Sequence, residues 1–546
     1  MAIKGIIRVL ELPDDGVLVS LRTKMIRDPI SGYITLSLLE RDLIDLPIVQ
    51  RLRRLHQLQT AFLVYPGAEH SRFQHSLGVM HLAGKFAVAL IRRTYGFRDV
   101  VIRKMLRIPN LTELGVDDIS DIFSAILGIR IAGLFHDIGH GPFSHAFDEI
   151  IIDKSSDLKN KRIYSHEDVG YFIYRNHLRE KIERIGARLE RNKEIPIHVD
   201  SLLESLDYIL APRSEMIALR EKTKLFIRAL RYVLREFIYP ADILDFVLRD
   251  SYYTGAREYG MVDVDRLLKF SVITTSLKPA HYIAPDIALF DNALNTLRAF
   301  LMSRFWLFNN VYFHKFSRIM DYAIKKLLSY THSEECIDFI DAILSIVDGG
   351  DVSKYILLDD YYVLYKALEK GKKAAEYAKM VLYRKPPIRE IFYHEIRIPL
   401  VKVERDEESR LKSEPLESVL REMREVIADK LEVSEEDLIV DYPPIKFFPD
   451  NPYLPARALI VIFMRGDKPI DFRHYTVQDA TAGMALNMTV LRIFLEHDIA
   501  RQVERRAHEE LLRDEIYKEF EERRILKRFT EALLFEFGFK EYGVTM

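Results

Sequence analysis

Length and composition place this 546-residue chain among folded proteins of roughly two to four modules, because it is too long for one core and is 48% hydrophobic and 30% charged. A formal charge of −2 excludes a general electrostatic attraction to nucleic acid or an anionic membrane, and no apolar run reaches the roughly 18–20 residues of a membrane span. The single cysteine, Cys336, excludes an internal disulfide, and with no signal-peptide pattern in "MAIKGIIRVL" it predicts a cytoplasmic protein.

Turn chemistry near the N-terminal end predicts a β-hairpin. The stretches "GVLVSLRTKMI" and "YITLS" flank "RDPISG", where Asp-Pro followed by Ser-Gly favours a turn. From about residue 38 to 330 helical periodicity dominates, as in "LPIVQRLRRLHQLQTAFL", where apolar residues recur at three- and four-residue steps. The expected helices are 77–95, 119–135, 166–190, 215–238, 241–250 and 286–330, with loops at 189–198 and 274–286.

Beyond residue 330 the pattern changes. "IFYHEIRIPLVKVERD", "DLIVDYPPIKFF" and "ARALIVIFMRG" are rich in β-formers and broken by Pro and Gly, which predicts an α+β module over about 385–480. The stretch 496–529 is charged and amphipathic, and we expect a solvated helix that covers part of the core rather than one dedicated to a partner. The expected fold is mainly α, with an N-terminal β-hairpin, a smaller C-terminal α+β module and a helical tail.

The stretch "RIAGLFHDIGHGPFSHAF", residues 130–147, places three histidines and an aspartate directly after an apolar helical turn. Buried ionisable groups need hydrogen bonds, neutralisation or a metal. Adjacent His136 and Asp137 point roughly 100° apart on a helix, which suits two ligands of one cation. Imidazole and carboxylate without thiolate favour Mn, Fe, Ni, Mg or Zn. Two ligands hold a metal loosely, so we expect others, and His75 and Asp242 are candidates.

Four segments in chain order carry a family resemblance: "YPGAEHSRFQHSLGV", "HDIGHGPFSH", "HED" and "ADILDFVLRD". One His-Asp pair is usually incidental, whereas this ordered series resembles the HD-domain phosphohydrolase superfamily and, more narrowly, the deoxynucleoside triphosphate triphosphohydrolases. The resemblance runs from about residue 24 to 330. It implies an HD-domain helical core with the hairpin over 1–330. Beyond it, the sequence patterns predict a helical linker and the α+β module over 331–480 and a C-terminal helical segment over 481–546. We expect none of the SAM domain that the vertebrate enzyme carries.

The resemblance implies one divalent metal ion held by His75, His136, Asp137 and Asp242. Such an ion polarises a phosphoryl oxygen and lowers the pKa of a bound water. In the family, water attacks the α-phosphate and releases deoxynucleoside and tripolyphosphate. The catalytic residues that carry over are His140, His145, His166 and Glu167. His166 with Glu167 resembles a dyad in which the carboxylate orients the imidazole for proton transfer.

Substrate contacts also carry over: Gln57 and Leu58 along the sugar and base, Arg72 and Arg304 on phosphate, Asp250 on the sugar 3′-hydroxyl, and Tyr312 under the deoxyribose. One departure concerns the triphosphate tail. Where the family has a lysine and a tyrosine, this chain has Ile243 and Phe246. This departure leaves open a shorter phosphate chain, or a tail held by another cation such as Arg249.

A regulatory nucleotide site of the family is echoed by Lys24, Asp45, Gln50 and Arg53. In the family the acid and the arginine grip a guanine, and here Arg27 replaces an expected asparagine. The alternative is a plain surface ion pair between Asp45 and Arg53. The resemblance further implies a nucleotide substrate, an activating nucleotide and a homo-oligomer, either a dimer or a tetramer. We expect neither a membrane nor nucleic acid as a partner.

Three functions therefore compete. The leading hypothesis is a metal-dependent phosphohydrolase that converts deoxynucleoside triphosphates to deoxynucleoside and tripolyphosphate. The runner-up is an HD phosphatase or phosphodiesterase that acts on nucleoside mono- or diphosphates or on a cyclic nucleotide, and Ile243 and Phe246 motivate it. A non-catalytic nucleotide-sensing scaffold is the third hypothesis, and the intact metal quartet argues against it.

Overall fold

The computed structural model of the protein describes residues 24–97, 100–212, 215, 219, 222–235, 237–278, 282–399, 414–443, 459–465, 468–475, 485–506 and 509–536. The chain divides into two compact units. The first comprises Met1–Leu307, Ile324–Lys379 and Leu459–His474, and the second comprises Phe308–Ala323, Met380–Ala458 and Tyr475–Met546. Residues 16–23 of the predicted first strand and the "PIKFF" segment of the predicted α+β module lie outside the described residues. In the part of the chain that is described, no helix is long and apolar enough to cross a membrane.

The first unit contains the predicted hairpin. Strands β1 (Lys24–Asp28) and β2 (Gly32–Leu36) pair antiparallel. The Asp28 carboxylate accepts the backbone N–H groups of Ile30 and Ser31 at 3.0 and 2.7 Å, which closes the turn. An aspartate that bonds to the backbone two and three residues further on is the turn chemistry that its sequence indicates.

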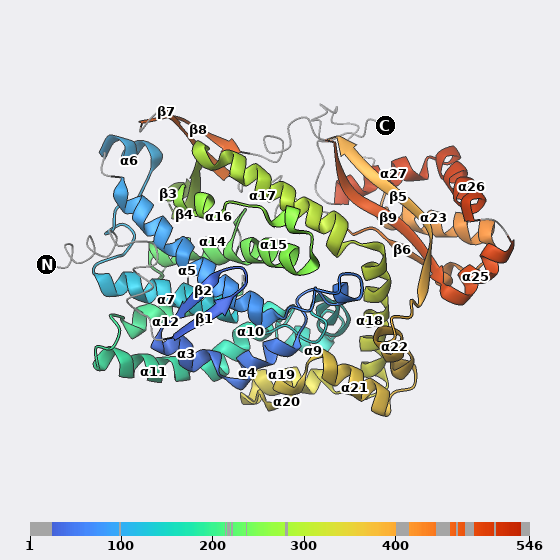
Figure 1. Ribbon diagram of the computed structural model, residues 1–546, viewed down its shortest axis with the longest axis horizontal. Coiled ribbons are helices and arrows are strands. Elements are labelled where there is room, and N and C mark those ends of the chain that lie inside the picture. The colour runs from blue at the N-terminus through green and yellow to red at the C-terminus, as the bar shows by residue number, and fades with distance from the viewer. Residues whose placement is uncertain are drawn as a thin grey trace. The chain divides into compact units, whose positions relative to one another are not determined.

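Two long helices lie at the centre of the first unit. α5 (Arg72–Gly96) begins after a capping box at Ser71, and α7 (Ile119–Phe135) begins after one at Asp118. The two helices pack along each other (Figure 1). α7 is apolar on all sides and is buried on all sides, as such a helix must be. The helix predicted over 119–135 is confirmed, whereas the one predicted over 77–95 starts earlier, at Arg72.

Shorter helices surround this pair. α15 (Ala241–Thr254) packs on α5, and α12 (Val199–Ile209) and α14 (Leu225–Leu234) pack on α7. The remaining helical segments of this unit are α3 (Leu38–Ile44), α4 (Pro47–Gln50), η1 (Arg51–Arg54), η2 (Ala61–Leu63), α6 (Val100–Leu106), α8 (His145–Phe147), η3 (Asp148–Ile152), α9 (Ser156–Asn160), α10 (His166–Ile173), η4 (Tyr174–Leu178), α11 (Arg179–Arg191), η5 (Arg257–Gly260), α16 (Val264–Lys269), η6 (Asp291–Ala293), α17 (Leu294–Leu307), α19 (Phe339–Gly349), α20 (Ser353–Leu357) and α21 (Asp360–Lys370). α18 (Lys315–Ser333) and α22 (Lys373–Leu382) have residues in both units.

The stretch predicted as a loop at 274–286 and as a helix from 286 is instead a β-hairpin. β3 (Ser271–Lys278) and β4 (Tyr282–Phe290) pair antiparallel, and β7 (Leu459–Arg465) joins β4 in parallel. β8 (Lys468–Tyr475) completes the sheet order β3-β4-β7-β8. The prediction was wrong because short apolar runs such as "IALF" fit strand and helix patterns equally well, and the β-branched residues of "SVITTS" decide for a strand. Within the helix predicted over 215–238, α14 covers Leu225–Leu234, while residues 216–218, 220, 221 and 236 lie outside the described residues.

The second unit is an α+β module around a three-stranded antiparallel sheet. Its strands, in the order β5-β9-β6, are β5 (Ile388–Pro399), β9 (Ala485–Glu496) and β6 (Leu438–Asp441). Its helical segments are η7 (Phe308–Tyr312), α23 (Leu416–Leu431), η9 (Glu435–Asp437), α25 (His497–Arg506), α26 (Glu509–Glu522) and α27 (Ile525–Glu536). Phe520 and Phe529 from the charged C-terminal stretch lie in one buried cluster with Leu491 and Ile493 of β9. That stretch therefore forms several helices that cover a core, and the fold is mainly α with small sheets, as predicted.

Candidate metal and phosphohydrolase site

Three helices of the first unit bring four potential metal ligands together. His75 lies in the first turn of α5, His136 and Asp137 directly follow α7, and Asp242 lies in the first turn of α15. The His75 Nε2 atom is 3.1 Å from Asp242 Oδ1 and 3.9 Å from Asp137 Oδ2. The His136 Nε2 atom is 3.2 Å from Asp137 Oδ1 and 3.7 Å from Asp242 Oδ1. Two imidazoles and two carboxylates thus face one another.

The orientation of both imidazoles fits a bound divalent ion. His136 Nδ1–H donates to the Gly133 carbonyl at 2.7 Å, so the Nε2 lone pair faces the cluster, where Nε2 is buried and has no hydrogen-bond partner. His75 Nδ1 lies 2.9 Å from Asp245 Oδ2, so its Nε2 faces the same point. Metal-binding histidines characteristically have the second ring nitrogen held by a carbonyl or a carboxylate. The donor set of nitrogen and oxygen without sulfur suits Mn, Mg, Fe, Ni or Zn.

The electrostatics of the cluster also favour a cation. Burial works to raise the pKa of the Asp137 carboxyl, but His136 and Arg72 outweigh it and hold this pKa below its usual range. Burial likewise opposes ionisation of Asp242, yet His136 and His75 keep its pKa well below the ordinary value. Both carboxylates are therefore ionised at neutral pH. Asp242 is 38% exposed while the other three side chains are buried, so the cluster opens to solvent on the side of Asp242.

Three further histidines gather beside Asp137. His140 Nε2 lies 3.5 Å from Asp137 Oδ1, and the His140 and His166 rings stack with centroids 3.5 Å apart. His145 is 74% exposed, and its ring centroid lies 5.2 Å from that of His140. Burial, together with the nearby Arg72 and His166, holds the pKa of His140 well below its ordinary value, so His140 is neutral at neutral pH.

The carboxylate that contacts His166 is Asp148, not Glu167. Asp148 Oδ2 lies 2.5 Å from His166 Nδ1, and it also lies 4.0 Å from His145 Nδ1. Glu167, the residue that the sequence paired with His166, instead forms an ion pair with Arg235 at 3.0 Å. Sequence reasoning missed Asp148, although its position three residues after His145 at the start of η3 is a signal that could have found it.

The loop that carries His140 is held from a distant part of the chain. The Tyr355 hydroxyl donates to the Gly139 carbonyl at 2.6 Å, and the buried Arg51 donates through Nη2 to the His140 carbonyl at 2.8 Å. The Asp360 carboxylate accepts the Phe143 N–H at 2.7 Å. A Cβ on Gly139 would lie 2.1 Å from the His166 carbonyl oxygen, so this close packing against α10 requires glycine. No local pattern in the sequence links these residues.

Arg72 contacts this cluster, and two of the sugar-site candidates are joined to each other. The buried Arg72 donates through Nη1 to Asp137 and through Nε to the Ser144 hydroxyl at 2.9 Å. The buried Asp250 accepts from His70 Nε2 at 2.8 Å, and the Gln57 N–H donates to the His70 carbonyl at 3.0 Å. His70, which the sequence did not single out, therefore joins Gln57 to Asp250.

The other predicted substrate residues are placed less directly. Leu58 is half-buried beside Gln57, and Arg304 is buried in α17. Tyr312 ends η7 in the second unit, where it packs against Phe308, so its role under a deoxyribose stays a prediction. Ile243 is buried and Phe246 is half-buried. Arg249 is completely buried and bonds to Asp245 and Asp28, which removes it as a candidate for holding a phosphate tail.

The predicted regulatory residues lie on α3, α4, η1 and the hairpin. Lys24 and Asp45 are exposed. The Arg53 guanidinium donates to Gln50 Oε1 at 2.8 Å rather than to Asp45, and it stacks 3.7 Å above the Phe73 ring. The structure therefore favours neither a simple Asp45–Arg53 ion pair nor a particular ligand, and nucleotide binding here stays a prediction.

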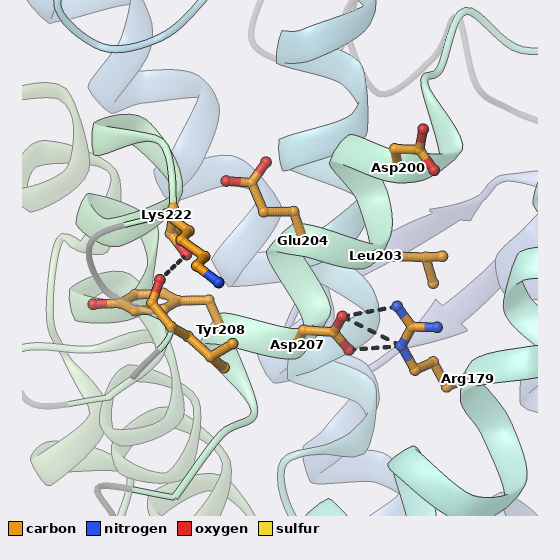
Figure 2. Close-up of a pocket in the computed structure, with 9 residues that line it drawn as sticks. Arg179, Asp200, Leu203, Glu204, Asp207, Tyr208 and Lys222 are labelled. Atoms are coloured by element: carbon orange, nitrogen blue, oxygen red, sulfur yellow. Dashed lines mark hydrogen bonds and ion pairs between the residues drawn. The ribbon is translucent and has the colours of Figure 1, made fainter. Parts of the chain in front are cut away.

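Two hollows elsewhere in the first unit contain none of the predicted site residues. One, of about 240 Å³, lies along α12, where Asp207 accepts two parallel hydrogen bonds from Arg179 and Glu204 also lines the hollow (Figure 2). The other, of about 390 Å³, is lined largely by acidic side chains, among them Asp118 and Asp121. Neither has the paired imidazoles and carboxylates of the cluster around Asp137.

Comparison with known families agrees with this geometry. Residues 72–223 match the HD domain, and residues 262–452 match the HD associated region. The first match begins three residues before His75 and contains His136, Asp137 and the three further histidines, while the second contains Tyr355 and Asp360. The chain therefore contains an HD domain, followed by an HD associated region.

Several relatives that the chain is similar to are named deoxynucleoside triphosphate triphosphohydrolases. The chain is 28% identical over 351 residues to the deoxynucleoside triphosphate triphosphohydrolase SAMHD1 homolog of Dictyostelium discoideum, a match that covers 64% of this chain and 56% of the relative. It is 31% identical over 306 residues to deoxynucleoside triphosphate triphosphohydrolase SAMHD1 of Gallus gallus, covering 55% and 44%, and 28% identical over 375 residues to that of Homo sapiens, covering 66% and 54%. The matched part of the chain spans about half the length of these relatives.

Proposed function

We propose that the protein is a divalent-metal-dependent nucleotide phosphohydrolase that converts deoxynucleoside triphosphates to deoxynucleoside and tripolyphosphate. The observation that carries this proposal is the convergence of His75, His136, Asp137 and Asp242 beside a second group of three histidines and Asp148. The names of the relatives support the choice of substrate.

The quartet would hold the metal ion. When bound, a divalent ion supplies a Lewis acid for a phosphoryl oxygen and makes bound water a nucleophile near neutral pH. Asp137 and Asp242 offset the charge of the ion, and the buried hydrogen bonds at His75 and His136 fix the ring orientations. Arg72 holds Asp137 through Nη1, and this buried guanidinium beside the quartet would donate to a phosphate oxygen.

His166 and Asp148 form the best-defined acid–base pair. Because Asp148 Oδ2 accepts the Nδ1 proton, His166 Nε2 is left to give a proton to the leaving oxygen of the deoxynucleoside. His145 is exposed beside this pair, so it meets an incoming phosphate chain from solvent. Buried His140, which is neutral, suits a hydrogen bond to a phosphate oxygen better than a charge contact.

Asp250 would select the sugar. The hydrogen bond from His70 Nε2 to Oδ1 fixes the position of the Asp250 carboxylate, which would accept a sugar hydroxyl, and the neighbouring Gln57 would provide a further contact for the sugar ring. Arg304, in the same unit, would bind phosphate.

A hydrolysis panel tests the proposal. The full-length protein is incubated with deoxynucleoside and ribonucleoside tri-, di- and monophosphates and cyclic nucleotides, with Mn²⁺ or Mg²⁺, and the products are resolved by ion-exchange chromatography. Tripolyphosphate from a deoxynucleoside triphosphate, lost in Asp137→Ala, supports the proposal. Orthophosphate instead would favour the phosphatase alternative, which the apolar Ile243 and Phe246 make the second candidate.

Metal analysis separates both enzymes from a nucleotide-sensing scaffold. Protein that stays metal-free after dialysis against Mn²⁺, Fe²⁺, Ni²⁺ and Zn²⁺ would favour the scaffold. We further propose a homodimer or homotetramer that an activating nucleotide stabilises through Lys24, Asp45, Gln50 and Arg53. Light scattering with and without a guanine nucleotide tests this assembly, and an unchanged monomer would refute it.

A further inference from the structure

A buried chain of charges connects the N-terminal hairpin to the metal ligand His75. At the end of β1, Asp28 accepts from Arg249 Nη1 at 2.8 Å and from Nη2 at 3.3 Å. Arg249 in turn donates through Nε and Nη2 to Asp245 at 2.8 and 3.0 Å. Asp245 Oδ2 then lies 2.9 Å from His75 Nδ1. All four side chains are buried, so solvent screens none of these contacts.

The geometry of this chain leaves Asp245 little freedom. Arg249 grips both carboxylate oxygens of Asp245, and on its other side the same guanidinium is gripped by Asp28. A Cβ on Gly78 would lie 1.9 Å from Asp245 Oδ1 and 2.4 Å from Arg249 Nη2, so α5 and α15 approach each other at this glycine. Asp245 can therefore turn only if Arg249 moves.

The hairpin fixes the far end of the chain. Asp28 Oδ1 also accepts the Ile30 and Ser31 N–H groups of the β1–β2 turn. One carboxylate thus closes the turn and anchors Arg249. An arginine with a carboxylate on each side is held in one plane, whereas an arginine with one partner can swing around it.

We infer that Asp28 is a positioning residue for the metal ligand His75, acting through Arg249 and Asp245, so that the docked hairpin sets the metal affinity of the site. This inference rests on the proposed metal-binding role of His75. Partners that orient a metal-binding histidine typically change metal affinity by 10–100-fold when they are removed. We therefore expect an effect of that size from a residue that touches neither the ligand nor its direct carboxylate partner.

The variant Asp28→Asn tests the inference. An asparagine keeps the side-chain oxygen that closes the turn but removes the charge that faces Arg249. The matched control is Glu40→Gln. Glu40 is equally buried and is paired with Arg130, which donates to the Thr35 carbonyl of the same hairpin, but it makes no contact with the chain to His75. Each variant neutralises one buried carboxylate that is paired with an arginine contacting the hairpin.

The measurement is Mn²⁺ binding to the metal-free full-length protein by isothermal titration calorimetry, with circular dichroism to confirm folding. We expect Asp28→Asn to bind Mn²⁺ at least 10-fold more weakly than the wild type and Glu40→Gln to bind within 3-fold of it, because only the first variant releases Asp245. Arg249→Lys, which keeps the charge but cannot bridge two carboxylates, should weaken binding similarly.

Four outcomes would overturn the inference. Asp28→Asn could bind Mn²⁺ as the wild type does, or Glu40→Gln could lose as much affinity as Asp28→Asn, which would reduce the effect to general destabilisation. Failure of both Asp28→Asn and Arg249→Lys to fold would show that the chain serves the fold rather than the ligand. Absence of Mn²⁺ binding to the wild type would reject the metal centre itself. This outcome distinguishes failure of the proposed function from failure of the inferred role of Asp28.

Discussion

Removal of the Asp360 carboxylate should reduce hydrolysis at the candidate metal site, although Asp360 is not one of the residues proposed to bind metal or substrate. Asp360 begins α21 and is buried, and its two oxygens accept the Phe143 N–H at 2.7 Å, the His56 N–H at 2.9 Å and His56 Nδ1 at 2.8 Å. Phe143 and Ser144 both have left-handed backbones, with φ of 57° and 55°. A loop with two consecutive non-glycine residues in that region needs an external anchor.

The magnitude follows from the groups that Asp360→Ala leaves behind. Two buried backbone N–H groups without acceptors cost about 1–3 kcal/mol each, so the free energy of unfolding should fall by roughly 2–6 kcal/mol. The loss is smaller where water replaces the carboxylate at these groups or at His56 Nδ1. The left-handed backbone of Phe143 and Ser144 stores about 1–2 kcal/mol per residue, which the freed loop can then release. A displacement of about 1 Å at the following His145 is enough for roughly a 100-fold loss of kcat.

Urea unfolding and steady-state hydrolysis measure the two effects separately. The control is Asp359→Asn, which removes the charge paired with Arg54 but keeps an oxygen to cap α21 at the Tyr362 N–H, and which does not contact the loop. This control should lose less than about 1 kcal/mol of stability and no activity. If Asp360→Ala keeps wild-type kcat at a temperature where it is folded, the loop does not depend on this anchor and the reasoning is refuted.

Three other predictions follow from the site. Asp137→Ala should abolish both turnover and metal retention while helix content by circular dichroism stays nearly unchanged; full activity would refute the assigned ligand set. Phe246 lies four residues after a metal ligand on α15. If the binding site for the triphosphate tail lacks only a hydroxyl here, Phe246→Tyr should lower KM for a triphosphate by roughly 2- to 10-fold. An unchanged KM would mean that the triphosphate tail binds elsewhere. Burial disfavours the charged form of His56, but Asp360 and Glu69 outweigh it and raise its pKa. The stability from this charge is therefore complete below about pH 6.5 and is lost as pH rises past the raised pKa. The difference in urea midpoint between wild type and His56→Gln should shrink from pH 6 to pH 9, and a constant difference would contradict this assignment.

The hairpin turn and both ends of α7 were predictable because their signals are local, and the start of α5, which was predicted five residues too late, also has a local signal. Asp28 bonds to the backbone within its own turn, and Ser71 and Asp118 cap the helices that follow them. The strands β3 and β4 were missed because their apolar runs are short and their pairing with β7, about 170 residues away, leaves no mark on a sequence window.

Adjacency in the sequence was a poor guide to the partner of His166. Consecutive residues on a helix point about 100° apart, so when His166 faces the cluster, Glu167 faces Arg235 instead. Asp148 reaches the imidazole from a separate turn, η3, and its identity depends on how that turn packs against α10. A carboxylate three residues after a histidine is common in helices, so this spacing makes Asp148 a candidate, but only the fold shows that its partner is His166.

Asp242 and Asp245 illustrate which contacts of His75 can be predicted from the sequence and which cannot. Three residues apart on α15, they share one helix face, and the two carboxylates contact the two ring nitrogens of His75. The second carboxylate was predictable in principle from this spacing, because a histidine ligand needs a partner for its other nitrogen. Arg249 lies four residues further along the same helix face. Its other partner, Asp28, is not on α15 but about 220 residues earlier in the sequence. Local periodicity can therefore identify the ligand, its partner and the partner's cation, but which distant element anchors that cation is decided by tertiary packing, and the hairpin could be assigned that role only from the structure.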